Sequence, residues 1–150
     1  MRTITVERID ALTRSRLATV SADALLVDAA KLLSDTHISL VIVCDPDGLM
    51  VGVITKTNIV QQVGHSCEII GAALAGEVMT RVVTSCRPTD SLLDVMAMME
   101  KRGFAHIPVV GENSKPRGVV NAGDALRALI ADEKYEARLL RDYVMGIGYQ

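Results

Sequence analysis

The second half of this chain repeats the pattern of the first half. When residues are compared at a spacing of 66 positions, landmark residues coincide without a gap. The coinciding pairs are Leu26 and Leu92, Asp28 and Asp94, Val43 and Val109, Gly52 and Gly118, and Val53 and Val119. Identities are few, so the repeat is recognised mainly from the hydrophobic pattern around them. A repeat of this length predicts one supersecondary unit that is built twice.

Each copy contains one amphipathic helix. Its apolar stripe follows the i, i+3, i+4, i+7 spacing of a helix that buries one face. The stripe consists of Leu26, Ala29, Ala30 and Leu33 in the first copy and of Leu92, Val95, Met96 and Met99 in the second. We expect Asp23 to cap the first helix and Thr89 or Asp90 to cap the second. Positive charge followed by glycine over 101–103 predicts the end of the second helix.

Two short strands follow each helix. They occupy 38–44 and 49–54 in the first copy and 104–110 and 117–120 in the second. Their β-branched residues, and the turn residues between them, predict an antiparallel pair. A short extended piece before each helix, at 18–20 and 83–85, completes a βαββα unit. One unit leaves an apolar sheet face exposed, so we predict an α/β (α+β) fold in which two pseudo-symmetric repeats pack sheet to sheet.

The repeat divides the chain into three parts. We assign residues 1–65 to the first repeat with its N-terminal segment, 66–79 to a linking helix and 80–150 to the second repeat. The last helix, predicted from Gly123 to Val144, extends beyond the repeat. Its apolar residues are Leu126, Leu129, Ile130, Ala137 and Leu140. This surplus apolar face predicts a homodimer.

Composition and charge argue against several classes of protein. The 16 basic and 18 acidic residues give a net charge of −2, and aromatic residues make up only 3% of the chain, which disfavours nucleic-acid binding. The start of the sequence is too polar for a signal peptide, and the apolar runs are too short to span a membrane. Cys44, Cys67 and Cys86 are odd in number and widely spaced, so we expect free thiols and a cytoplasmic protein.

Catalytic motifs do not occur in the sequence. It contains no nucleophile elbow, no HExxH zinc motif and no phosphate-binding P-loop, so we do not expect an enzyme or a required cofactor. His65 and Cys67 lack a second pair at ligand spacing, so we expect no metal site.

The strongest functional signal is a pair of polar residues at the start of the last helix of each copy. Thr55 and Asn58 stand three residues apart in the first copy, as do Asn121 and Asp124 in the second. One interpretation is a capping box, in which the side chains bind free backbone N–H groups. The other is a ligand site, because a carboxylate can accept hydrogen bonds from a vicinal diol and a helix start favours phosphate. Gly123 is costly inside a helix and indicates space beside Asp124.

A second signal lies in the strand Ala-His-Ile-Pro-Val-Val over 105–110. Pro108 cannot donate a backbone hydrogen bond, which places it at an edge or a break in the sheet. His106 alternates with Ile107 and therefore points away from the side that buries Ile107. A lone histidine is common as an ordinary surface or core residue. Because Asp124 lies in the same repeat, however, we weigh a ligand role for His106 equally with this ordinary role.

In the order of their helices and strands and in their motifs, the two copies resemble the CBS domain family, which is named after cystathionine β-synthase. The resemblance rests on the doubled repeat, the Gly-x-x-polar-x-x-Asn/Asp run at each last helix and the Ile-Pro-Val-Val strand. It covers about residues 11 to 135. It implies a disc-like pair with two clefts that often bind adenine nucleotides or S-adenosylmethionine, in modules that commonly form homodimers.

The resemblance also assigns roles to individual residues. Thr55 and Asp124 match the hydroxyl and the ribose-binding acid of the family motif, whereas Asn58 replaces the acid in the first copy and Asn121 replaces the hydroxyl in the second. This match makes Asp124 a stronger ligand candidate than its first-copy counterpart.

The remaining candidates come from the strands. His106 matches a basic residue that contacts phosphate, and Thr19 and Thr84 match positions beside the adenine. The predicted nucleotide-binding residues are therefore Asp124, Asn121, His106, Pro108, Thr84, Thr55, Asn58 and Thr19.

Two functions follow from the resemblance. The first is a regulatory module that binds AMP, ADP, ATP or a related adenine nucleotide and alters its dimer contacts or its contacts with a regulated protein, whose identity the sequence does not give. The second is a structural and dimerisation module with empty clefts, whose function lies in protein interaction. The Asp124 and His106 pair favours the first, and the incomplete motif of the first copy favours the second.

Overall fold

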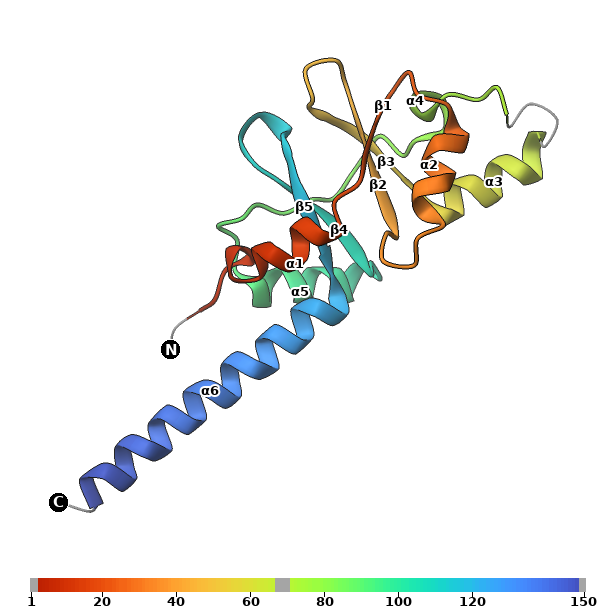
Figure 1. Ribbon diagram of the computed structural model, residues 1–150. Coiled ribbons are helices and arrows are strands. Elements are labelled where there is room, and N and C mark those ends of the chain that lie inside the picture. Colours follow the sequence, from red (N-terminus) through yellow and green to blue (C-terminus); the bar gives the residue numbers. More distant parts are fainter. Residues whose placement is uncertain (1–2, 67–70, 149–150) are drawn as a thin grey trace.

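Two small β-sheets, one from each copy, organise the chain. The computed structural model describes residues 3–66 and 71–148. The first copy contains β1 (Thr19–Ser21), α2 (Leu26–Leu33), β2 (Leu40–Cys44), β3 (Met50–Thr55) and α3 (Lys56–Ser66). The second contains α5 (Leu92–Arg102), β4 (His106–Val110), the short η3 (Glu112–Ser114), β5 (Pro116–Asn121) and α6 (Ala122–Gly148). The segments η1 (Val6–Ile9) and α1 (Asp10–Ser15) precede the first copy, and α4 (Ala75–Val78) lies between the copies. The predicted α/β (α+β) class is confirmed (Figure 1).

The strand registers reproduce the repeat residue by residue. In the first copy β2 pairs with β3 in antiparallel fashion, with Leu40 opposite Thr55. In the second copy β4 pairs with β5 in the same way, with His106 opposite Asn121. Both ladders are irregular at the same point, after Val43 and after Val109. The predicted antiparallel pairs are therefore confirmed in both copies.

The two sheets differ in their third strand because of one proline. In the first copy the Ile42 N–H donates to the Ala18 carbonyl at 2.9 Å, and β1 runs parallel to β2. Pro108 stands at the position equivalent to Ile42 and has no N–H to donate. The strand expected over 83–85 is therefore absent, and a single parallel bridge between Cys86 and Val109 takes its place.

The helix ends differ in part from the predicted caps. α2 begins after Leu25 without a side-chain cap, so the Asp23 cap is wrong. At α5 the Ser91 hydroxyl accepts a hydrogen bond from the Asp94 N–H, whereas the Asp90 carboxylate binds the Arg87 N–H before the helix starts. The predicted end at 101–103 is confirmed, because residue 103 is a glycine in the left-handed conformation with φ 73°.

The expected linking helix over 66–79 is reduced to α4 in its described part. The backbone before α4 is used for pairing with the first copy instead. The Leu26 N–H donates to the Ala73 carbonyl and the Ala75 N–H donates to the Ala24 carbonyl, both at 2.8 Å. These backbone groups are therefore not available to an unbroken helix. Residues 67–70, which include Cys67, lie outside the described residues.

An apolar cluster holds the copies together. It consists of Leu40, Ile42 and Val53 from the first copy and Val119 from the second, all buried. Separate clusters lie under the helices of each copy. The sheets therefore face each other as predicted.

The N-terminal segment packs with the second copy, although it precedes the first in the chain. Ile4, Val6 and Ile9 are buried in the same cluster as α5 and the start of α6. α1 packs against β5, as Figure 1 shows. The second copy therefore completes its core with residues from the other end of the chain.

The thiols that the structure describes are unpaired. Cys44 and Cys86 are both free. Burial, followed by the charge of Asp90, raises the pKa of Cys86 to about 12. Burial and the charge of Asp45 also raise the pKa of Cys44. Both side chains therefore remain protonated, unreactive thiols at neutral pH.

α6 extends away from the body of the molecule (Figure 1). Along it, Leu126, Ile130 and Leu140 are exposed, with Leu140 at 65%. Within the described ranges no helix has the length and apolar character needed to cross a membrane.

The contact between α1 and β5 depends on a glycine, which gives a first prediction. A Cβ atom at Gly118 would lie 2.8 Å from the backbone carbonyl of Thr13. Gly118→Ala should therefore lower the free energy of unfolding by about 1–3 kcal/mol, as overpacking does. Gly64→Ala is the control, because a Cβ there meets nothing within 4 Å in α3. Urea denaturation compares the two variants, and equal stability would contradict the packing of α1 on β5.

Candidate ligand-binding clefts

A cavity of about 210 Å³ lies between the two copies. Five of the predicted site residues line it, namely Thr55, Asn58, Thr84, His106 and Pro108. We call this cavity the first cleft. Larger hollows of about 460 Å³ lie elsewhere, at the ends of the strand pairs, but none of the predicted site residues lines them.

In the first cleft, Asn58 connects the start of α3 with the segment that enters the second copy. Its Oδ1 accepts hydrogen bonds from the Thr55 N–H at 2.9 Å and from the Thr55 hydroxyl at 3.1 Å. Its Nδ2 donates to the Thr80 hydroxyl at 3.1 Å. The two motif residues thus bind each other, in the manner of a cap. They still line the cleft together with Thr84, and Thr55 is half-buried.

The apolar part of the first cleft comes mostly from the second copy. Val82, Val83 and Phe104 line it together with Pro108. Val82 is 93% exposed, which is unusual for a valine. An apolar wall beside polar side chains is the composition of many small-molecule sites.

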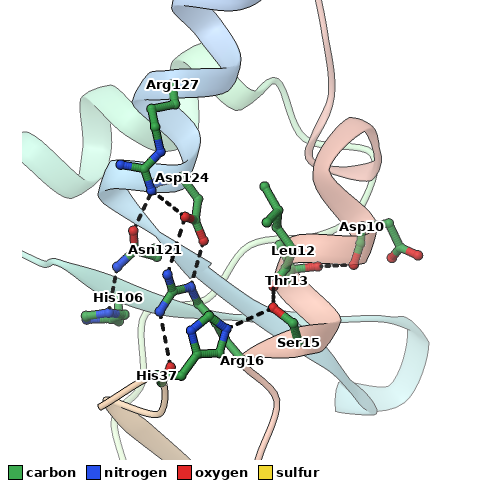
Figure 2. Close-up of polar contacts among 10 residues, drawn as sticks. All are labelled: Asp10, Leu12, Thr13, Ser15, Arg16, His37, His106, Asn121, Asp124 and Arg127. Carbon is green, nitrogen blue, oxygen red and sulfur yellow. Dashed lines mark hydrogen bonds and ion pairs between the residues drawn. The ribbon is translucent and has the colours of Figure 1, made fainter.

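In the second copy, the equivalent motif residues form a continuous hydrogen-bond network, shown in Figure 2. The Asn121 Oδ1 accepts from the Asp124 N–H at 2.9 Å, and the Asn121 amide nitrogen lies 2.9 Å from His106 Nε2. Because Oδ1 already binds a backbone donor, the amide nitrogen must donate to His106. His106 therefore accepts at Nε2 and is neutral, with its proton on Nδ1.

Electrostatics agree with a neutral His106. Burial, and then the positive charge of Arg16, lower its pKa, while the charge of Asp124 acts in the opposite direction. The His106 ring would carry a charge at neutral pH only if a bound anion raised its pKa.

Asp124 is already paired inside the protein. Arg16 Nε donates to one carboxylate oxygen at 2.7 Å and Arg16 Nη2 donates to the other at 3.3 Å. Arg127 Nη2 donates to the second oxygen at 2.7 Å. The side chains of Asp124 and Arg16 are 6% and 15% exposed. Burial would raise the pKa of Asp124, but the hydrogen bonds and charges of Arg16 and Arg127 outweigh it and lower the pKa.

Arg16 is the residue that sequence reasoning missed. Its Nη1 donates to the His37 carbonyl at 3.1 Å, and His37 Nε2 lies 3.1 Å from the Ser15 hydroxyl (Figure 2). The repeat places Arg16 at the position equivalent to Val82, but this points to a cleft only once the structure shows that Val82 lines one. By the repeat, the place around Asp124, Asn121 and Arg16 corresponds to the first cleft, and for this reason we call it the second cleft.

The remaining predicted residue lies apart from both networks. Thr19 is exposed on β1 and is not among the residues that line the first cleft. Thr84, which the prediction paired with Thr19, accepts a hydrogen bond from Arg102 Nη1 at 3.0 Å. Within residues 3–66 and 71–148, no group of three or more metal-ligating side chains occurs.

Comparison with known proteins identifies the family. A model of the CBS domain matches residues 6–65 and 75–131, and the chain belongs to this family. Among curated relatives, a homoserine O-acetyltransferase of Methanobrevibacter ruminantium is 24% identical over 123 residues, which cover 82% of this chain. The chain spans only 24% of that relative's length.

Solved structures share the fold. The CBS-domain protein ATU1752 of Agrobacterium tumefaciens is 28% identical with a TM-score of 0.70, over 85% of this chain and 94% of that one. The CBS domain pair of MJ0100, in complex with 5′-methylthioadenosine and S-adenosylmethionine, is 21% identical with a TM-score of 0.70, over 88% and 99%. CBSX2 of Arabidopsis thaliana, in complex with AMP, is 22% identical with a TM-score of 0.70, over 86% and 98%.

The network around Asp124 gives a prediction for stability against pH. The pKa of His106 is lowered in the folded state, so its contribution should be lost as pH falls below about 6.5, the ordinary value for histidine. The pKa of Asp124 is also lowered, so its contribution is present above about 3.9 and lost as pH falls further through the folded pKa. The melting temperature should therefore decrease in two steps on acidification.

Substitution separates the two steps. His106→Gln keeps a hydrogen-bonding side chain but cannot titrate, so it should flatten the upper step and leave the lower one. His65→Gln, at an exposed position in α3, is the matched control and should keep both steps. An unchanged upper step in His106→Gln would show that another group titrates there.

Proposed function

We propose that this protein is a regulatory module that binds an adenine-containing nucleotide in the first cleft. The observation that carries the proposal is the cavity itself, in which predicted polar residues and an apolar wall from the other copy converge. The ligands named for MJ0100 and CBSX2, which are AMP, S-adenosylmethionine and 5′-methylthioadenosine, all contain adenosine. Membership of the same family supports a ligand of this class here.

The first cleft offers one partner for each part of such a ligand. Val82, Val83 and Phe104 provide an apolar wall for the adenine base. Thr55 and Asn58 provide a hydroxyl and an amide that can exchange their mutual hydrogen bonds for bonds to ribose hydroxyls. His106, neutral in the free protein, would gain charge beside a phosphate and so make binding stronger at lower pH.

Asp124 matches the ribose-binding acid of the family motif, but its surroundings support the first cleft instead. Both oxygens of its carboxylate accept hydrogen bonds from arginine. A ligand in the second cleft would have to displace Arg16 and break a buried ion pair, which is costly. We therefore assign Asp124 a structural role in the free protein.

A structural and interaction module remains the second candidate function. It is favoured by the fact that the motif side chains already have partners within the protein. Asn58 binds the Thr55 hydroxyl, Asn121 binds the backbone N–H of Asp124, and the Asp124 carboxylate binds Arg16. In the described part of the chain, no buried polar side-chain atom lacks a partner.

The match to an acetyltransferase does not argue for catalysis here, because the chain spans 24% of that protein. The unpaired thiols support a cytoplasmic location.

Ligand binding is tested by calorimetry with AMP, ADP, ATP, NAD and S-adenosylmethionine. We expect at least one of them to bind, and Thr55→Val to weaken that ligand about fivefold, because the loss of one hydrogen bond costs about 1 kcal/mol. Thr57→Val is the matched control, since Thr57 is exposed and does not line the cleft. Absence of heat with every compound would favour the structural module, and equal affinity in Thr55→Val would argue against the ribose assignment.

The homodimer that we propose forms through α6. The exposed residues Leu126, Ile130, Ala137 and Leu140 follow one another at steps of four, seven and three residues. With Glu133 counted as one position, the steps alternate between four and three, which is the spacing of a coiled-coil seam. The positions next to this seam on one side carry Arg127, Lys134 and Arg141. An antiparallel pair would place these basic rows opposite each other, so the charges favour a parallel pair with a second copy of this chain.

Sedimentation at micromolar concentration tests the dimer. The wild type should have twice the monomer mass, and Leu140→Arg should shift it toward the monomer because a charge then stands in the apolar seam. Ala131→Arg is the control, because Ala131 is exposed on α6 away from the seam and gains the same side chain. A wild-type monomer would contradict the role of α6, and so would a Leu140→Arg dimer as stable as the control.

A further inference from the structure

Equivalent hollows lie at the hairpin ends of the two strand pairs, at the opposite end of each pair from the motif residues. Each has a volume of about 460 Å³ and is lined by the hairpin turn and by the segment before the helix of its copy. Arg87 and Arg117 line the hollow of the second copy, and Ser21 and Val51, which stand 66 positions earlier, line that of the first. The fold therefore builds one hollow twice.

A β-bulge places one side chain at each hollow. The register shift after Val43 leaves Val51 as the extra residue of β3, and the shift after Val109 leaves Arg117 as the extra residue of β5. A bulge changes the direction of a side chain. The stem of Arg117 lies over Gly111, where a Cβ atom would lie 3.5 Å from its Cγ and Cδ. The second copy thus has a guanidinium where the first copy has a valine.

Three cations line the hollow of the second copy, whereas the equivalent positions of the first copy are uncharged. They are Arg87, Lys115 and Arg117, in place of Ser21, Leu49 and Val51. We call this hollow the basic hollow. Among the residues that the structure describes, none forms a hydrogen bond or an ion pair with these three side chains. Their donors are therefore available to a molecule from outside.

The hollow of the first copy differs, because its charged groups already bind the backbone. Asp45 Oδ1 accepts a hydrogen bond from the Leu49 N–H at 2.9 Å, and Glu77 Oε1 accepts one from the Leu74 N–H at 2.9 Å. Arg81 Nη2 donates to a backbone carbonyl at 3.2 Å. These groups serve the local structure, whereas the cations of the basic hollow have no such role.

The backbone that carries Arg87 is held on two sides. Its N–H donates to the Asp90 carboxylate at 2.8 Å, and the Pro88 carbonyl accepts from the Glu7 N–H at 3.0 Å. The preceding residue, Cys86, forms two backbone hydrogen bonds with β4, each of 2.9 Å. The hollow is therefore preorganised between β4 and the N-terminal segment, which lowers the entropic cost of binding.

We propose that the basic hollow binds a small phosphorylated compound, with its phosphate groups between Arg87, Lys115 and Arg117. Guanidinium groups bind phosphate oxygens in pairs, and a lysine adds a compact charge. Glu7 and Glu112 also line the hollow, and they would repel an extended polyanion such as a nucleic acid. No large apolar side chain lines it, so it does not suit a lipid surface. The site is separate from the first cleft and independent of its proposed function.

Calorimetry at constant ionic strength tests the site with inorganic pyrophosphate as the probe. The wild type should bind it, and Arg117→Gln should weaken binding about tenfold because charge-assisted hydrogen bonds are lost. Arg81→Gln is the matched control, since Arg81 lines the equivalent hollow, and should keep the affinity. His106→Gln, in the first cleft, should also keep it.

A change of opposite sign gives a second test. Glu112→Gln should strengthen pyrophosphate binding about twofold, because it removes a negative charge beside the anion. Asp23→Asn removes the same charge from the equivalent hollow and should have no effect. Equal affinity in these two variants would contradict a site in the basic hollow.

The other outcomes also decide. No binding by the wild type, or equal affinity in Arg117→Gln and Arg81→Gln, would overturn the proposal. A loss in His106→Gln would place the anion in the first cleft and overturn it as well. Failure of every nucleotide in the earlier screen, with pyrophosphate still bound, would contradict only the function of the first cleft. If Arg117→Gln does not fold, the Nε–H resonances of Arg87 and Arg117 in the wild type should shift as pyrophosphate saturates the protein, and their constancy would overturn the proposal.

Discussion

The contact between the two sheets is the interaction on which the other features depend. Leu40, Ile42 and Val53 of one copy meet Val119 of the other, and each of these side chains would face water in a single copy. Sheets of two or three strands are not stable alone in water, so neither copy provides a complete core. The apolar contact ends where each strand pair gives way to a helix, and there the polar motif residues lie beside the neighbouring copy. The positions of the clefts thus follow from the extent of the apolar contact.

The two clefts show how one backbone plan supports different chemistry. The strand registers agree pair by pair, yet Asn58 corresponds to Asp124 and Val82 corresponds to Arg16. The Asn58 amide donates hydrogen bonds to a neighbouring threonine hydroxyl and to a backbone carbonyl, so this side chain needs no charged partner in the first cleft. A buried carboxylate does need one, and the chain provides a guanidinium for it. The two clefts therefore differ both in the motif, where Asp124 replaces Asn58, and at the position before each copy, where Arg16 replaces Val82.

The sequence was sufficient for the repeat, the strand pairs and five residues of the first cleft, because these depend on local periodicity and on motifs within one copy. The predicted Asp23 cap was wrong, because backbone contacts from the segment before α4 take the place of a side-chain cap. The predicted linking helix is reduced to α4, because backbone groups of this segment form hydrogen bonds with the first copy. The Arg16–Asp124 pair joins residues 108 positions apart. No local pattern predicts such a pair, although the repeat spacing placed Arg16 beside a cleft. The sequence indicated Asp124 as a ligand candidate, which stays a prediction, while its partner Arg16 could be known only from the fold.

The packing of the N-terminal segment also bears on how the chain folds during synthesis. Ile4, Val6 and Ile9 leave the ribosome well before Leu92, Val120 and Ala125, which belong to the core that buries them. The first copy can collapse while these early residues still have no apolar partners. The step that unites both ends of the chain therefore comes late and closes a long loop, which slows folding. Until then the early segment is accessible to chaperones and proteases, so its exposure reports whether the second copy has folded.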